Sequence, residues 1–205
     1  MRRWQGRGDA NQSLGGKDMS TNPLSVQKSV KRYLKGRQLP FETIVSESGA
    51  CLVVSLLDCE SCPGKLLGVD FYFHNNCMEV KVHYAATASK WIKERKNHLA
   101  SLYRLLNYIN AMVWMPTNDG KQGEIYPYSY FYTPRFTVTE DGSYDLCCTS
   151  LVDYDVFNMA PLATLDYFTA VVPAYFEELA QPIFLSLLDE ITVEQAIQMI
   201  RDKNL

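Results

Sequence analysis

Apolar residues first recur at a regular spacing after about residue 22, and the spacing is that of a helix. Val26, Val30 and Leu34 stand four residues apart, which gathers them along one side of a helix predicted over residues 24–38. Asn22 suits the N-cap of this helix, because its side chain can accept a hydrogen bond from a free amide of the first turn. The other side is therefore predicted to carry four basic residues, open to solvent or to an anionic partner: Lys28, Lys31, Arg32 and Lys35.

Three strands are predicted in the next part of the chain, over residues 50–57, 67–74 and 77–84. Asn75 and Asn76 suit a two-residue turn between the last two strands, because asparagine tolerates the positive φ of a type I′ turn. In the register set by that turn, Asp70 faces Lys81 and forms an ion pair with it. The other face is then wholly apolar: Val69, Phe71, Phe73, Met78, Val80 and Val82.

Helical spacing returns twice in the remainder of the chain. Leu102, Leu106 and Ile109 predict a helix that begins at a cap on Asn97 and ends near Trp114. We expect this helix to share one core with the apolar face of the hairpin. The C-terminal third is predicted to contain a helix opened by Pro161 with Leu162, Leu165, Phe168 and Val172 facing inward, a kink or a new segment at Pro173, and a final helix capped by Thr192 and Gln195.

A second hairpin is predicted around the Asp-Gly dipeptide that ends at Gly142. A two-residue loop would mix apolar and polar residues on each face. A three-residue loop with Gly142 in the left-handed conformation opposes Val138 to Tyr144 and Phe136 to Leu146. We prefer the three-residue loop because it keeps one face apolar.

Together these elements predict an α+β fold, in which an antiparallel sheet of about five strands packs on helices in the order α-βββ-α-ββ-α. The length of 205 residues and the hydrophobic fraction of 47% suit one domain of ordinary size. We expect a disordered basic tail over residues 1–22, a single α+β domain over residues 23–190 and a C-terminal helical extension over residues 191–205.

The longest apolar stretches are short and contain prolines, and no apolar core follows the arginines at the start of the chain. We therefore expect neither membrane insertion nor secretion, but a cytoplasmic protein.

Charge is distributed unevenly along the chain. Residues 1–38 contain nine basic and two acidic residues, which gives +7, whereas the remainder contains eleven basic and 21 acidic residues, which gives −10. A basic front end on an acidic body predicts either an electrostatic contact within an assembly or a separate anionic partner.

Cys59 and Cys62 form the motif that could carry chemistry, because two cysteines three positions apart can form a redox disulfide or supply half of a zinc site. A redox pair of the thioredoxin type begins a helix, whereas here a Pro-Gly turn follows. Cys147 and Cys148 cannot easily complete a zinc site, because neighbours on a strand point to opposite faces. We expect ordinary cysteines in a reducing compartment, with a small enzyme or a redox or metal protein as the alternative.

No other catalytic pattern stands out. The three histidines are not predicted to gather at one place, and the chain has no glycine-rich phosphate loop, His-Glu-x-x-His helix or Gly-x-Ser-x-Gly turn. We therefore expect no enzyme activity, no cofactor and no bound metal.

A run rich in tyrosine, with Tyr126, Tyr128 and Tyr130, could stack on bases or pack in an interface. It contains no Lys or Arg before Arg135, and the surrounding body is acidic. Protein contact is therefore the stronger interpretation, and we do not expect nucleic acid as a partner.

The predicted element order, together with the Leu-Leu-Asn-Tyr-Ile-Asn-Ala pattern of residues 105–111, resembles the YbjN-like family, whose fold is that of type III secretion chaperones. The resemblance covers about residues 24–188. It implies a small, usually dimeric, noncatalytic α+β module that binds protein segments or acts in regulation, and it carries over no catalytic residues. We therefore expect a homodimer or a complex with a protein of unknown identity, formed through apolar and aromatic surface with the basic helix face as a steering element.

Overall fold

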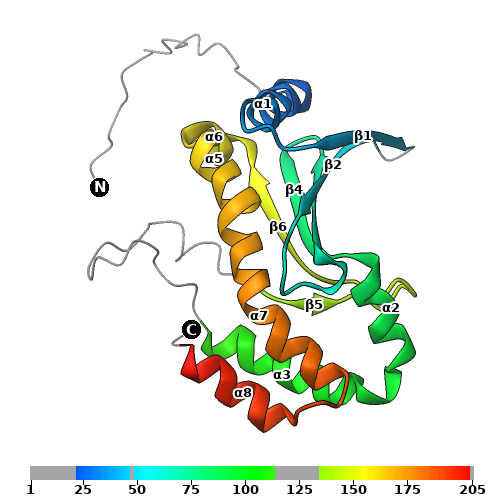
Figure 1. Cartoon of the computed structure of the whole chain (residues 1–205). Helices are drawn as coiled ribbons and strands as arrows, with labels where there is room; N and C mark the ends of the chain where they lie inside the picture. The colour runs from blue at the N-terminus through cyan, green and yellow to red at the C-terminus, as the bar shows by residue number, and fades with distance from the viewer. Residues whose placement is uncertain (1–21, 47–48, 114–133, 204–205) are drawn as a thin grey trace, which may run out of the picture.

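Six strands form one antiparallel sheet in the spatial order β1-β2-β3-β4-β6-β5 (Figure 1). The structure is a computed structural model that describes residues 22–46, 49–113 and 134–203. The predicted α+β class is confirmed, with six strands where about five were expected. The strands are β1 Phe41–Ser46, β2 Gly49–Leu57, β3 Leu66–Phe73, β4 Cys77–Tyr84, β5 Thr137–Val138 and β6 Leu146–Asp153.

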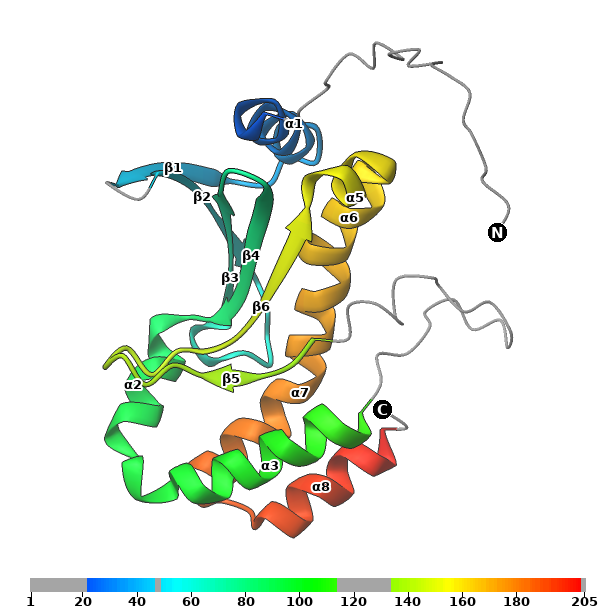
Figure 2. The same cartoon turned by 180° about the vertical axis from the view of Figure 1, so that it is seen from behind.

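The helices gather on one face and at both ends of the sheet. They are α1 Pro23–Gly36, α2 Ala86–Glu94, α3 Leu99–Met112, α5 Tyr154–Met159, α6 Pro161–Asp166, α7 Val172–Leu187 and α8 Val193–Asp202. At one end α3 and α8 lie side by side, and α7 runs from them along the sheet to α6, beside α1 (Figures 1 and 2). Within the described residues, no helix is long and apolar enough to cross a membrane.

The predicted register of the β3–β4 hairpin is confirmed, although neither Asn75 nor Asn76 adopts the positive φ that the expected type I′ turn requires. Asp70 lies opposite Lys81 and Phe71 lies opposite Val80. The apolar face is buried in the core, since Val69, Phe71, Met78, Val80 and Val82 are all 0% exposed and Phe73 packs against them. Leu102, Leu106 and Ile109 of α3 belong to the same core cluster, as expected.

The preferred register of the second hairpin is wrong. Val138 lies opposite Leu146, not Tyr144, so the connection between β5 and β6 is longer than three residues. Gly142 does adopt the expected positive φ of 96°, but Tyr144 adopts one too, at 59°. The Asp141 carboxylate accepts two hydrogen bonds from the residue two positions on, and these bonds organise a wider loop than the face pattern alone predicts.

Three elements were missed, namely β1, α2 and the short α5. β1 escaped prediction because an edge strand does not need to bury one face, and its Ile44 and Val45 are both exposed despite lying on opposite sides of the strand. α2 escaped because its buried side includes Ala88 and Ser89, which add little to an apolar stripe.

Helix boundaries show further differences. Asn97 is not the cap of α3, because it lies within a short 3₁₀ turn over Lys96–His98, after which α3 begins without a side-chain cap. Leu162 does not face inward but is exposed, because the short α6 buries its other apolar side at Leu165. Pro173 is the second residue of α7 and so belongs to the start of a new segment, after a π-helical turn.

Two predicted caps are confirmed. The Asn22 side chain accepts a bond of 2.8 Å from the amide of Leu24 at the start of α1. Thr192 and Gln195 form a reciprocal capping box at the start of α8. α8 packs on α3 and α7, with its buried residues in the common core cluster.

Candidate functional site

The basic residues predicted on the outer side of α1 lie there. Lys28, Arg32 and Lys35 are exposed and Lys31 is half-buried. Among the residues that the structure describes, none of the four has a carboxylate partner. Unpaired cations on one helix face create a local positive potential, which favours an anionic partner. The other predicted contact residues, Tyr126, Tyr128 and Tyr130, lie outside the described residues.

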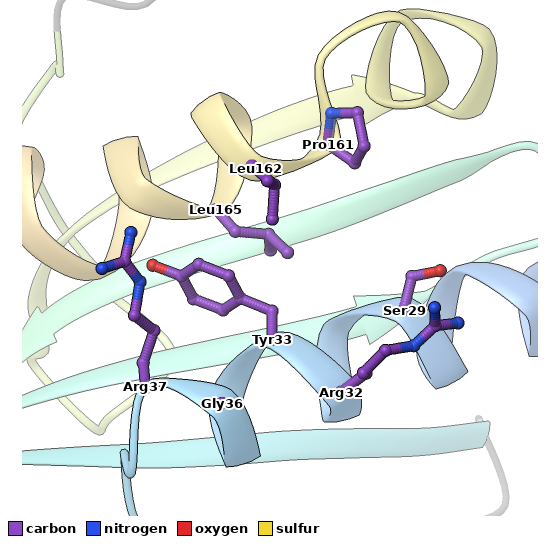
Figure 3. A pocket seen from close by; sticks show the side chains of 8 residues that line it. All are labelled: Ser29, Arg32, Tyr33, Gly36, Arg37, Pro161, Leu162 and Leu165. Atoms are coloured by element: carbon purple, nitrogen blue, oxygen red, sulfur yellow. The ribbon is translucent and has the colours of Figure 1, made fainter.

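A groove of about 510 Å³ lies between α1 and α6, next to this basic face. Leu162 and Leu165 point from α6 toward α1, and Arg32 and Arg37 stand on either side of Tyr33 (Figure 3). The groove thus combines an apolar wall on one helix with two guanidinium groups on the other. Its lining residues are Ser29, Arg32, Tyr33, Gly36, Arg37, Pro161, Leu162 and Leu165.

One end of the groove is fixed by a polar cluster. The Arg37 guanidinium and the Tyr33 hydroxyl both donate to Oδ1 of Asp166, at 2.7 and 2.8 Å, and Oη of Tyr33 lies 2.7 Å from the Thr169 hydroxyl. Burial raises the pKa of Tyr33, so the hydroxyl keeps its proton and acts as a donor. The pair of Arg37 and Asp166 is largely exposed, so its role is to orient these groups more than to stabilise the fold.

The two arginines of the groove are therefore not equivalent. Arg37 already has a carboxylate, whereas Arg32 is exposed and has none among the described residues. The apolar wall of the groove is open, since 65% of Leu162 is exposed. The adjacent α5 exposes Met159 still further, at 85%. An apolar side chain and an acidic group could be bound here together, the first against Leu162 and the second by Arg32.

Cys59 and Cys62 lie close together, as expected, but both are buried in the apolar core. Burial raises the pKa of Cys59 and raises that of Cys62 to about 12, so both remain protonated thiols at neutral pH. Thiol–disulfide chemistry requires a thiolate, and redox motifs achieve it by lowering a thiol pKa. The helical turn that follows spans only Pro63–Lys65, too short to supply a substantial helix dipole.

A polar cluster that the sequence did not fully predict lies on the other face of the sheet. Lys81 does not form its ion pair with Asp70. Its ammonium group lies 2.9 Å from Asp145, a residue that precedes β6, and Asp70 instead lies 3.4 Å from Nε2 of His83. Ser89 of α2 donates to the second oxygen of Asp145. The correct partners come from distant parts of the chain, which hairpin register alone cannot reveal.

The protonation of His83 follows from one hydrogen bond and one ion-pair contact of its ring. Nδ1 lies 3.0 Å from the backbone oxygen of Tyr84, which can only accept, so Nδ1 carries a proton. When Nε2 is protonated as well, the positively charged ring is attracted to the Asp70 carboxylate. Although burial opposes the charge, Asp70 raises the pKa of His83 above its ordinary value. Nδ1 is thus hydrogen-bonded, while Nε2 makes only the ion-pair contact of 3.4 Å with Asp70, which links β4 to β3 on this face of the sheet.

This ring position depends on a glycine. Gly68 lies opposite His83 in the sheet, and a Cβ atom at Gly68 would lie 2.3 Å from Nε2 of the ring. The bare backbone at Gly68 therefore provides the space that lets the imidazole reach Asp70.

No group of three or more His, Cys, Asp or Glu side chains in the described ranges is arranged to hold a metal ion. The groove between α1 and α6 is thus the candidate site that joins exposed apolar surface to unpaired charge. Comparison with protein-family profiles, with curated protein sequences and with solved structures found no match for this chain.

Proposed function

We propose that this protein is a noncatalytic protein-binding or regulatory module, which binds an acidic, amphipathic segment of another protein in the groove between α1 and α6. The observation that carries the proposal is that an unpaired guanidinium, Arg32, and an exposed leucine, Leu162, line the same groove. The resemblance to secretion chaperones agrees with such a role.

The apolar side of the groove supplies the anchor. Leu162 and Pro161 line it from a short helix held against α1, so they are already in place before a partner binds. Preorganised apolar anchors contribute most to the lifetime of a complex, because little side-chain freedom remains to be lost.

The basic side selects the partner's charge. Arg32 can bind a carboxylate with two parallel hydrogen bonds, and the three lysines of α1 extend the positive surface around it. Charges at the rim mainly accelerate association and make it sensitive to salt. Reversal of Lys28, Lys31, Arg32 and Lys35 to Glu should therefore slow association at low ionic strength and change dissociation much less.

The alternative function, redox or metal chemistry at Cys59 and Cys62, is less favoured because buried, protonated thiols are poor nucleophiles and poor ligands. All six cysteines are unpaired, which supports action in a reducing compartment such as the cytoplasm.

Site-specific photo-crosslinking in cells tests the groove. A photoreactive amino acid replaces Leu162 in one variant and Leu57 in a matched control, since both leucines are 65% exposed but Leu57 lies at the end of β2. We expect one protein to crosslink at position 162 and not at position 57.

A charge change then connects this crosslink to recognition. Arg32→Glu should reduce the crosslink at position 162 about tenfold, as expected for loss of one charge-assisted contact. Lys93→Glu, an equal charge change on the exposed side of α2, should leave it unchanged. Equal crosslinking at positions 162 and 57, or none at 162, would contradict the proposed groove.

A further inference from the structure

The two edges of the sheet differ in a way that bears on assembly. β5 is a two-residue edge, Thr137–Val138, whereas β1 is a six-residue edge. β1 exposes 50% of Ile44 and 78% of Val45. Long edge strands in monomeric proteins are commonly protected by lysine, proline or a bulge, and β1 contains a single charged residue, Glu42.

The hydrogen-bond pattern of the sheet shows which groups of β1 point outward. The amide of His74 donates to the carbonyl of Cys77 at 3.0 Å, so this pair is a hydrogen-bonded pair. Hydrogen-bonded and non-hydrogen-bonded pairs alternate along an antiparallel ladder. The amide and the carbonyl of any one residue point toward the same neighbouring strand. We apply this alternation to each strand pair in turn, from β3–β4 to β2–β3 and then to β1–β2. It places the amides and carbonyls of Thr43 and Val45 on the side of β1 that points away from β2.

We propose that β1 pairs antiparallel with β1 of a second copy of this chain, with Ile44 opposite Ile44 on the two-fold axis. In a continuous sheet, residues that are paired across two strands have side chains on the same face. A residue of β1 must therefore pair with a residue of the other β1 whose number is odd if its own is odd, or even if its own is even. In this register Thr43 of each copy exchanges hydrogen bonds with Val45 of the other. Three β-branched residues then face one another, which suits a strand pair, and Glu42 does not meet its own copy.

Charge favours this register and this antiparallel direction. α1 directly precedes β1 and carries the unpaired lysines, so two copies of α1 repel each other if they come close. With Ile44 on the axis, the two copies of Phe41 are six residues apart along the strands, or about 20 Å. That separation exceeds the screening length of about 8 Å at physiological salt. A parallel pair would place the two basic helices side by side.

The proposal also explains the exposure of Val45 and predicts a closed dimer. Val45 lies on the side of the sheet that the helices cover, yet remains exposed because it is at the edge. Thr43 of the second copy would lie beside it. The remaining outer edge of the joined sheet is β5 on both sides, too short to add another strand.

Proline at the outward-facing Thr43 tests the backbone contact. This substitution removes an amide that the monomer does not use, so the β1–β2 pairing is kept and the dimer loses two symmetric hydrogen bonds. We expect Thr43→Pro to raise the dimer dissociation constant by about tenfold or more in sedimentation equilibrium. Val45→Lys, which protects the edge by charge, should have the same direction of effect, and circular dichroism checks that both variants fold.

Disulfide crosslinking through an introduced cysteine tests the register. Ile44→Cys should form a disulfide-linked dimer on mild oxidation, because facing residues of a non-bonded pair have Cα atoms about 4.5 Å apart. Residue 42 lies on the same face of β1 but not on the two-fold axis, so Glu42→Cys should not form a disulfide-linked dimer. Both are made with Cys51→Ala, since Cys51 lies opposite Ile44 within one copy.

A wild-type protein that stays monomeric up to high micromolar concentration, or equal crosslinking at positions 42 and 44, would overturn this proposal. The surface lies on β1 and not in the groove, so failure of the dimer leaves the proposed function standing, and the reverse also holds.

Discussion

The two faces of the β3–β4 hairpin show two different ways of making a sheet stable. On one face Phe71 and Val80 are 0% exposed and pack into a continuous apolar core. On the other face Asp70 and Lys81 lie directly opposite each other, yet each pairs with a different residue. Apolar packing needs only volume and proximity, whereas a buried charge needs a partner with the right geometry. The comparison teaches that alternation along a strand predicts burial well and predicts ionic partners poorly.

The largest expected effect is on the apolar face. Phe71→Ala removes a fully buried ring and should lower the free energy of unfolding by about 3–5 kcal/mol, measured by chemical denaturation. Leu151→Ala, on the other face of the sheet and 66% exposed, should change it by less than about 0.5 kcal/mol. Similar losses for the two variants would remove the distinction between the faces.

An intermediate effect is expected at Gly68. Gly68→Ala brings a methyl group onto the His83 ring and should cost about 1–3 kcal/mol in denaturation experiments. Gly36→Ala is the control, because nothing lies within 4 Å of a Cβ atom there, and it should be neutral or slightly stabilising.

A double-mutant cycle assigns the Gly68 effect to its cause. In a His83→Ala background the ring is absent, so Gly68→Ala should lose most of its cost. A cost that stays the same in that background would show that backbone strain, not the imidazole, requires glycine.

The smallest effect is the pH dependence of the polar face. The pKa of His83 is raised in the fold, mainly by Asp70 against the opposing effect of burial. The stability from the charged pair is therefore fully present below the unfolded pKa of about 6.5 and is lost as pH rises through the folded pKa. Wild-type stability should fall over this window, and Asp70→Asn should flatten the profile.

The neighbours of His83 do not titrate in that window. Lys81 and Asp145 keep their charges at neutral pH, because their ion pair raises the pKa of Lys81 and lowers that of Asp145 although burial opposes both. Burial raises the pKa of Cys147, which lies opposite His83. Identical pH profiles for wild type and Asp70→Asn, recorded as unfolding free energies, would show that the pair of His83 and Asp70 binds no extra proton.

Whether the register of two strands could be predicted from the sequence depended on the length of the loop that joins them. The β3–β4 register was predictable because a two-residue turn at Asn75 and Asn76 leaves one register that separates apolar from polar residues. The β5–β6 register was not predictable, because hydrogen bonds to the Asp141 side chain organise a longer loop. The pattern of apolar and polar residues does not reveal the length of that loop. Edge position hid β1 for a related reason, since Ile44 and Val45 are both exposed and the strand shows no alternation between buried and exposed residues.

By itself the sequence determined the α+β class, the amphipathic stripe of α1, its basic outer face and the first hairpin, because each depends on residues close together in the chain. Only the tertiary structure decided that α1 packs beside α6. The groove joins residues 29–37 to residues 161–165, and the periodicity of α6 had placed Leu162 on the wrong side. Local patterns indicate which residues can be buried. Which helices become neighbours is determined by the packing of the whole core.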